Sequence, residues 1–333
     1  MSEISPLPFV EATLAYQKTA AVKAAVGLDL FTHVSDGAVD IDTLAGRTGA
    51  SPRGLRILCD FLTVHGFVEK SARGYAATPS TRVFLDRRSP NYLGSIIEFH
   101  AAPQMCSLFL SDPVAYVRNG GSVDSGSVAP DHALWRTFAE SMEQTMTPIA
   151  TAIAKDVASW PVKLANILDV AAGHGVFGLA IAKTLPGAQV TAIDWADVLS
   201  RARDNAERAG LGASFHTIAG DAFAVDWGSG YDLVLLANFL HHFDQDACIG
   251  LLAKAKASLT PGGKVIAVEF VPNEDRVSPP FQAAFAFYML GSTPRGDAFT
   301  AGDLERMGRA AGFSSMSVKP LPRSVESLVL FGQ

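Results

Sequence analysis

Two adjacent histidines and two nearby acids stand where they could do chemistry, in the stretch NFLHHFDQD. His241 and His242 follow an apolar run, and Asp244 and Asp246 come directly after them. Adjacent side chains diverge by about 100° on a helix and lie on opposite faces of a strand, so one site would rarely use both rings. A zinc site would need donors closer to an i, i+4 arrangement and further ligands. We therefore expect no metal, which leaves proton transfer or plain packing.

A second candidate is the loop in DVAAGHGVFG, where Gly173, Gly175 and Gly178 satisfy the pattern G-x-G-x-x-G between an apolar strand and a helix. Taken alone, this pattern suggests a dinucleotide whose pyrophosphate lies at the helix N-terminus. An NAD dehydrogenase is thus one possible interpretation.

Three acids favour a nucleoside without phosphate. Asp169 lies just before the loop, where it would repel a pyrophosphate but can accept hydrogen bonds from an ammonium group. Asp194 ends the second strand and suits a ribose diol. Asp221, in AGDAF after the third strand, can accept from the amino group of adenine, with Ala222 and Phe223 as apolar cover. This arrangement indicates S-adenosylmethionine (SAM) better than NAD.

The elements that must position these residues are strands alternating with helices after residue 164. The apolar strands read ANILDVAA, AQVTAID, ASFHTIAG, YDLVLLA and GKVIAVEF. Continuous apolar strands with helical crossovers predict a parallel sheet covered on both faces. We expect a doubly wound, Rossmann-like α/β domain over residues 164–333, with ligands at the carboxyl edge of its strands.

The preceding residues predict two further parts. Over residues 1–90, short helices, one begun by Ser51 with Pro52 in its first turn, and a hairpin around Arg73 indicate a mainly helical, winged-helix-like domain. Residues 35–90 hold eight Lys or Arg and six acids, hence no strong basic face, so a structural or dimerising role is favoured over DNA binding. Residues 91–163 are helical and apolar, typical of a linker that can also roof a pocket.

Composition limits the partners. The 333 residues carry a net charge of -6, so neither nucleic acid nor an anionic membrane is expected, and a small molecule is favoured. Cys59, Cys106 and Cys248 are widely spaced and form no CxxC pair, which fits a reducing cytosol. No signal peptide or membrane span is evident, and we expect a cytoplasmic protein.

Taken together, the motifs resemble the dimeric small-molecule O-methyltransferases of the caffeic acid and hydroxyindole type. The loop from Asp169 to Gly175, Asp194, GDAF at 220–223, LHHFD, TPGGKV and RAAGF stand in the family's order behind the N-terminal winged helix. The resemblance covers nearly the whole chain. It implies a seven-stranded sheet with the last strand antiparallel, a homodimer formed through the N-terminal domain, and SAM as cofactor with S-adenosylhomocysteine (SAH) as product.

The residues and the resemblance together assign the site. The predicted cofactor-binding residues are Asp169, Gly173, Gly175, Asp194, Trp195, Asp221, Ala222, Phe223, Asn238 and Met142. The predicted substrate-binding residues are Phe138, Met142, His242, Tyr288 and Met289. For Phe138, Met142, Tyr288 and Met289, plain core packing is the alternative.

The resemblance makes His241 the general base and Glu269, at the end of the fifth strand, the acid that orients its ring. A phenol of pKa ~10 is mostly protonated at neutral pH, and a free imidazole of pKa ~6.5 can take its proton as the new bond forms. Structural packing is the alternative for His241, and a solvent-facing acid is the alternative for Glu269.

The chain departs from the family's pattern at three places. Ala171 and Ala172 stand where consecutive glycines are common, and the small Ala222 follows the adenine-binding acid. Ala298, with Asp297 beside it, stands where plant members carry a second acid flanking the histidine. Whether Asp297 replaces that acid is open.

The leading hypothesis is a SAM-dependent O-methyltransferase that methylates a hydroxyl of an aromatic or polyketide-like small molecule. The alternatives are C- or N-methylation, a non-methylating reaction on the same scaffold, and a SAM-sensing winged-helix regulator.

Overall fold

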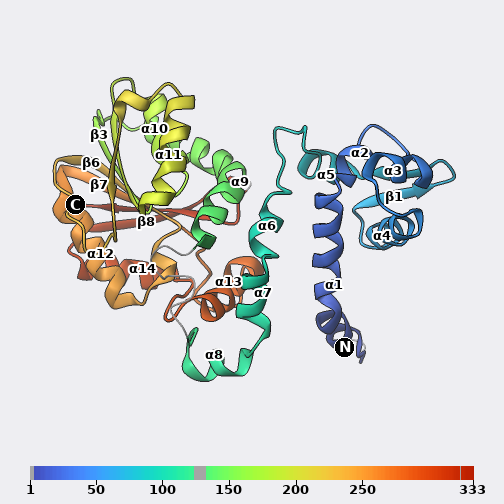
Figure 1. The fold of residues 1–333 in the computed structure, drawn as a ribbon. Helices are drawn as coiled ribbons and strands as arrows, with labels where there is room; N and C mark the ends of the chain where they lie inside the picture. The colour runs from blue at the N-terminus through green and yellow to red at the C-terminus, as the bar shows by residue number, and fades with distance from the viewer. Residues whose placement is uncertain (1–3, 124–132, 323) are drawn as a thin grey trace. The chain divides into compact units, whose positions relative to one another are not determined.

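The computed structural model describes residues 4–123, 133–322 and 324–333, with only the backbone for residues 133–136 (Figure 1). The chain divides into two compact units, residues 1–106 and 107–333. This division falls inside the predicted middle part, 91–163, and the predicted bounds at residues 90 and 163 stay predictions. Within the described ranges, no helix is long and apolar enough to cross a membrane.

The N-terminal unit is mainly helical, with one small hairpin. Its elements are α1 (Leu7–Gly27), α2 (Leu30–His33), α3 (Ile41–Thr48), α4 (Pro52–Val64), β1 (Val68–Ser71), β2 (Gly74–Ala77), α5 (Pro79–Phe84) and α6 (Ile96–His100), and α7 (Pro103–Leu110) spans the division. The predicted start of α4 is confirmed, because Ser51 is its N-cap and accepts a hydrogen bond from Gly54 N. β1 and β2 pair antiparallel, as the predicted hairpin requires.

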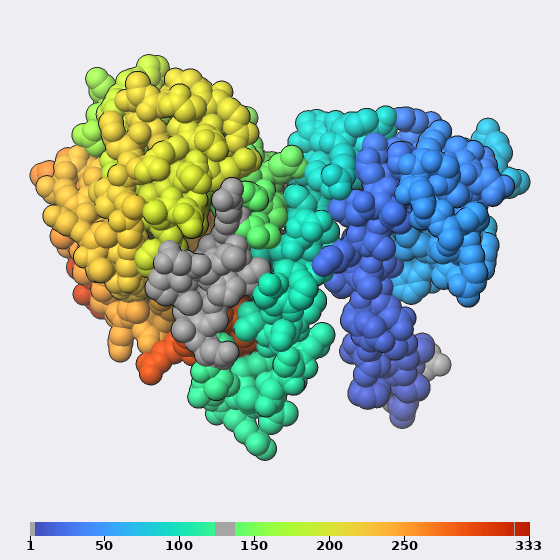
Figure 2. Space-filling model, in the orientation of Figure 1, coloured from blue at the N-terminus to red at the C-terminus, as the bar shows by residue number. Residues whose placement is uncertain are grey.

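The first helix of this unit carries an uncovered apolar surface. Every described residue of α1 up to position 20 is exposed. Leu7, Phe9, Val10, Leu14 and Tyr16 are among the large exposed apolar residues of the chain. Figure 2 shows α1 as a dark blue column that extends beyond the rest of its own unit. Contiguous apolar surface of this kind is typical of an interaction site.

The second unit is a sheet covered by helices on both faces. After α7 its elements are α8 (Pro113–Asn119), α9 (Ala133–Ala158), β3 (Asn166–Val170), α10 (Val176–Thr184), β4 (Gln189–Asp194), α11 (Ala196–Arg208), η2 (Gly212–Ser214), β5 (Phe215–Ala219), β6 (Tyr231–Ala237), η3 (Leu240–His242), α12 (Gln245–Ser258), β7 (Leu259–Glu269), α13 (Pro280–Ser292), α14 (Ala301–Ala310), β8 (Ser315–Pro320) and β9 (Ser327–Gly332). In Figure 1, α9, α10 and α11 lie together on one face, and α12 and α14 lie together on the other.

The strand order confirms the predicted fold class. The sheet has seven strands in the order β5-β4-β3-β6-β7-β9-β8. Strands β3 to β7 pair parallel, whereas β9, the last strand, is antiparallel to both of its neighbours. The parallel strands are nearly continuous runs of buried apolar residues because helices cover both faces.

The register brings the strand ends to one edge. Val170 pairs with Ile193, and Ala237 pairs with Val268. The loops that follow β3, β4, β5, β6 and β7 therefore leave the sheet at the same edge. Motifs that are about 20 residues apart or more along the chain become neighbours there, which is where doubly wound sheets bind ligands.

Candidate active site

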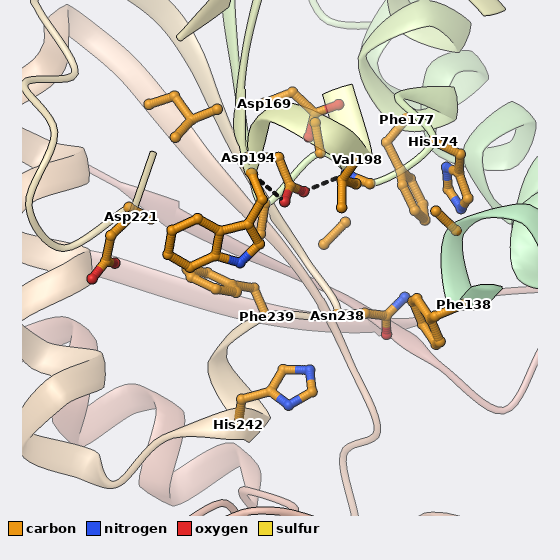
Figure 3. Close-up of a pocket in the computed structure, with 18 of the residues that line it drawn as sticks. Phe138, Asp169, His174, Phe177, Asp194, Val198, Asp221, Asn238, Phe239 and His242 are labelled. Carbon is orange, nitrogen blue, oxygen red and sulfur yellow. Dashed lines mark hydrogen bonds between the residues drawn. The ribbon is translucent and has the colours of Figure 1, made fainter. Parts of the chain in front are cut away.

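A cavity of about 310 Å³ opens at this edge of the sheet (Figure 3). Ten predicted site residues line it: Phe138, Asp169, Gly173, Asp194, Trp195, Asp221, Ala222, Phe223, Asn238 and His242. The other lining residues are Ala139, Met146, Ala171, Ala172, His174, Phe177, Ile193, Val198, Gly220, Ala237, Phe239 and Phe243. Figure 3 shows Asp169 and Asp194 close together near the top of the view, with Asp221 to one side and His242 across the cavity. Three acids thus surround one mostly apolar space.

Asp194 is held by two backbone amides. Its Oδ2 accepts from Gly173 N at 2.8 Å, and its Oδ1 accepts from Trp195 N at 2.7 Å, the two dashed lines of Figure 3. Gly173 adopts φ +58°, which points its amide at this acid and is easiest for a glycine. Burial raises the pKa of Asp194 to about 6. Each oxygen keeps a further lone pair, so the acid can still accept hydrogen bonds from a diol.

Asp169 is a buried acid with an opening towards the cavity. Its Oδ2 accepts from Gly178 N at 3.0 Å, and a Cβ on Gly178 would lie 2.8 Å from that oxygen. The third glycine of the motif therefore lets α10 begin against the carboxylate. Burial raises the pKa of Asp169 to about 7, with a smaller contribution from Asp194. A ligand cation beside this acid would stabilise the charged carboxylate, which burial by itself disfavours.

Asp221 begins a tight loop after β5. Its Oδ1 accepts from Phe223 N at 2.9 Å, and its carbonyl accepts from the amides of Ala224 and Val225. Ala222 is buried, whereas Phe223 stays 46% exposed and meets the ring of Phe243 edge-on at 4.9 Å. The apolar cover beside Asp221 is therefore supplied by aromatic rings from two loops.

His241 and Glu269 form a buried pair beside the cavity. His241 Nδ1 lies 2.6 Å from Glu269 Oε2, and the two residues are only 4% and 2% exposed. The other carboxylate oxygen of Glu269 accepts from Leu240 N at 2.9 Å, so the acid is fixed on both sides. With Nδ1 engaged by the acid, Nε2 is the nitrogen that can face a substrate.

Aromatic rings continue from this pair. Phe285 meets the His241 ring edge-on at 5.0 Å and stacks on Phe270 at 3.9 Å. Tyr288 stacks on Phe285 at 5.7 Å and lies 5.0 Å from Phe109. The rings of α7 and α13 thus form an aromatic cluster next to His241.

Comparison with known proteins assigns the family. A model described as the O-methyltransferase domain matches residues 113–314, and a model described as the O-methyltransferase dimerisation domain matches residues 10–87. The first match alone covers more than half of the chain. This chain belongs to the O-methyltransferase family.

Three relatives illustrate the likeness. The chain is 43% identical to a candidate O-methyltransferase from Nostoc punctiforme, whose crystal structure matches with a TM-score of 0.96 over 99% of this chain and 100% of that one. It is 24% identical to the tetracenomycin polyketide synthesis 8-O-methyl transferase of Streptomyces glaucescens, over 93% of this chain and 92% of the relative. Human N-acetylserotonin methyltransferase in complex with SAM shares the fold, at a TM-score of 0.83 and 19% identity over 100% and 99% of the two chains.

The departures from the family's pattern have structural outcomes. Ala171 adopts φ +54°, a left-handed conformation that costs an L-residue about 1–2 kcal/mol. At Ala171 the loop thus keeps a conformation that suits glycine. Asp297 accepts from Ala298 N at 2.8 Å and pairs with Arg276, 3.4 Å away. Its contact with His241 is through the backbone, from Asp297 N to the His241 carbonyl.

Four predicted binding residues lie outside the cavity lining. Gly175 is the N-cap of α10 at φ +72°. Met142 is buried one helical turn before Met146, the methionine that lines the cavity. Tyr288 belongs to the ring series described above, and Met289 is buried in α13. Their binding roles stay predictions.

Two polar residues at the site were missed by sequence reasoning. His174, between the two loop glycines, lines the cavity, and burial lowers its pKa to about 4. Glu326 is 3% exposed, and the Asn238 side chain lies close enough to lower its pKa. Burial and the nearby Glu269 raise the pKa of Glu326 to about 8. The position of His174 inside the glycine loop was a usable signal, whereas no local pattern marks Glu326.

The histidine pair of NFLHHFDQD is asymmetric. His241 contacts Glu269, whereas His242 lines the cavity, and burial holds the pKa of His242 well below its ordinary value. Asp244 accepts from Ala247 N at 2.9 Å and caps α12. Among the residues that the structure describes, no group of three or more His, Cys, Asp or Glu side chains could hold a metal.

Proposed function

We propose that this protein is a SAM-dependent O-methyltransferase that methylates a hydroxyl group of an aromatic or polyketide-like small molecule, with His241 as general base. The pairing of His241 with Glu269 carries the proposal. A histidine whose Nδ1 is held at 2.6 Å by a buried carboxylate presents its Nε2 in one orientation and tautomer.

The cavity fits the proposed cofactor. SAM, when bound, supplies a methyl group on a positively charged sulfonium. Asp169 is a buried acid that can accept from its ammonium group, and Asp194 keeps lone pairs for the ribose hydroxyls. Asp221 can accept from the adenine amino group, while Phe223 and Trp195 cover the base. Asn238 and Gly173 complete the proposed contacts.

His241 and Glu269 have complementary roles in the proposed reaction. His241 Nε2 takes the proton from the acceptor hydroxyl as the new carbon–oxygen bond forms. Glu269 accepts a hydrogen bond from the Nδ1–H group of the ring. Its negative charge stabilises the imidazolium that forms. Removal of the proton at the moment of transfer contributes about 10²–10⁴-fold to such reactions.

The acceptor is proposed to be flat and largely apolar. The rings of Phe285, Tyr288 and Phe109 extend from His241, and aromatic surfaces of this kind stack with planar ligands. The named relatives act in tetracenomycin polyketide synthesis and on N-acetylserotonin, both consistent with this class. His242, Phe138 and Met146 line the same cavity, and we expect them to contact the acceptor there.

The test has two parts. Calorimetry of the purified protein with SAH should show binding, and methyl-labelled SAM incubated with a panel of phenols, flavonoids and aromatic polyketides should give a labelled O-methyl product. A panel of matching anilines and carbon acids distinguishes N- and C-methylation. Absence of SAH binding, or label transferred only to nitrogen or carbon, would contradict the proposal.

The same proposal includes a homodimer formed through the N-terminal unit. The dimerisation model matches residues 10–87, and α1 exposes apolar side chains that burial in a partner would cover. Light scattering should give twice the mass of one chain. Replacing Phe9 and Leu14 of α1 by Asp should shift the mass towards that of the monomer, whereas a wild-type protein with the mass of one chain would contradict the dimer.

A further inference from the structure

One lysine side chain donates hydrogen bonds to the backbone of the loop that follows β5. Lys254 projects from α12, and its Nζ donates to three carbonyls of the loop, those of Ala222 at 2.9 Å, Phe223 at 3.1 Å and Val225 at 2.7 Å. An ammonium group has three hydrogens to donate and no acceptor. Its donors and the three carbonyls therefore match in number.

A buried tryptophan completes this arrangement. Trp227 is 1% exposed, and its Nε1 donates to the Ala222 carbonyl at 2.8 Å. Lys254 Nζ also lies 5.0 Å from the centre of the Trp227 ring, within the range of a cation–π interaction. The Ala222 carbonyl thus receives two hydrogen bonds, and the start of the loop is fixed by side chains from two directions.

The backbone amides of this loop bond within the loop, whereas its carbonyls bond Lys254. The amides of Phe223, Ala224 and Val225 bond within the loop, to the side chain and carbonyl of Asp221. The carbonyls that bond Lys254 face α12, whereas Asp221, Ala222 and Phe223 line the cavity. The outward contacts of the loop therefore determine how its cavity face is presented.

We propose that Lys254 is a positioning residue that holds residues 221–225 in the conformation that binds the adenine end of the cofactor. This inference rests on the proposed function, since it takes Asp221 and its neighbours as adenine-binding. Lys254 itself is not among the residues that line the cavity.

The matched pair of variants is Lys254→Met and Lys256→Met. Methionine keeps an apolar stem of similar length but removes the three donors. Lys256 lies on the same helix and makes the same kinds of contact, to the Gly312 carbonyl and the Phe313 ring, away from the cavity. A loss of stability alone would be shared by both variants.

The first measurement is cofactor affinity. The Kd for SAH should rise roughly tenfold or more in Lys254→Met, because a loosened loop must be ordered on binding. It should change by less than about twofold in Lys256→Met. The Kd for 5′-methylthioadenosine, which carries the adenine but no amino acid, should rise by the same factor, and kcat at saturating SAM should stay near wild type. An SAH affinity that falls equally in both variants would overturn the proposal.

The second measurement needs no ligand. Hydrogen exchange of the free protein should speed up over residues 221–227 in Lys254→Met and not in Lys256→Met. Unchanged exchange there would also overturn the proposal. If wild-type protein failed to bind SAH, the cofactor assignment would fall and with it the adenine role of Lys254, while a local rise in exchange would show that the tie itself exists.

Discussion

The proposed cofactor side of the cavity and the proposed base side next to it are built from different contacts. The cofactor side comprises residues 169–178, 194–195 and 220–223, and its acids are held mainly by backbone amides such as Gly173 N and Gly178 N. The base side comprises residues 238–243 and 269, and its central contact joins two side chains, those of His241 and Glu269. Binding on the first side thus depends on main-chain conformation, whereas chemistry on the second depends on one buried pair.

The difference predicts that variants on the two sides change different quantities. A change on the base side should lower kcat with little effect on SAH affinity. A change on the cofactor side should raise the Kd for SAH and leave kcat at saturating SAM nearly intact.

The largest effect is expected on the base side, from His241→Ala. Loss of the proton acceptor should lower kcat by about 10²–10⁴-fold, while the Kd for SAH stays near wild type because His241 is not part of the cavity lining. Initial rates with labelled SAM and calorimetry with SAH measure the two quantities. If kcat survives and the Kd rises instead, the division of the cavity into two sides is wrong.

Glu269→Gln should have the next largest effect. The amide nitrogen of glutamine can donate to His241 Nδ1, which would place the ring proton on Nε2 and prevent that atom from accepting a proton. We expect kcat to fall about 10–100-fold, by analogy with the loss when a residue that orients a metal-binding histidine is replaced. Steady-state kinetics with both substrates varied is the measurement, and Glu269→Asp is the matched charged control. Activity equal to wild type in the glutamine variant would show that Glu269 does not orient the base.

On the cofactor side, Asp194→Asn should weaken SAH binding. Both carboxylate oxygens accept from backbone amides, so the nitrogen of asparagine must face a donor from either Gly173 or Trp195. Hydrogen bonds to a charged group are worth about 1.5–3 kcal/mol, which corresponds to roughly a 10–100-fold rise in Kd. Calorimetry measures this rise. A lowered kcat at saturating SAM would count against the comparison.

The same side should show a pH dependence of binding. The pKa values of Asp169 and Asp194 are raised to about 7 and about 6 in the free protein. The ionised forms would accept the hydrogen bonds of a cationic or hydroxylated ligand, so the SAH affinity should be greatest above pH 7 and should fall as the pH drops through these two values. Between pH 8 and pH 5 we expect a loss of about tenfold or more. Asp194→Asn should flatten the part of the curve near pH 6, and a flat wild-type curve would contradict the assignment.

The smallest effect is expected from Asp297→Asn. Its carboxylate bonds the Ala298 amide and pairs with Arg276, and it reaches His241 only through a backbone bond. We therefore expect kcat and the Kd for SAH within about twofold of wild type. A fall in kcat comparable with that of Glu269→Gln would mean that Asp297 acts as a second acid on the base.

Several features of the fold could be predicted because their signals are local. Apolar strands between helices predicted the parallel sheet, and the caps at Ser51 and Asp244 follow from a polar side chain placed before a helical pattern. Asp169, Asp194 and Asp221 could be placed at one edge because each lies at or next to the end of a parallel strand. The sequence did not show which side chains on different helices and strands lie close to one another.

Helix position along the sheet is one such distance. Met142 and Met146 are four residues apart and lie on the same face of α9, so the sequence cannot tell which of them reaches the cavity. The packing of α9 against α10 and the contact of Asn238 Nδ2 with Met146 Sδ at 3.5 Å favour the second.

By itself, the amino-acid sequence determined the succession of strands and helices along the chain, the acids at the strand ends and the likeness to the family, since periodicity and motif order are properties of neighbouring residues. Only the tertiary structure decided which groups meet across elements: Glu326 beside Asn238, Lys254 beneath the loop at 221–225, and Asp297 paired with Arg276. The physical reason is that a side chain's partner is set by the packing of whole helices and strands, and a shift of one turn or one residue exchanges it for another.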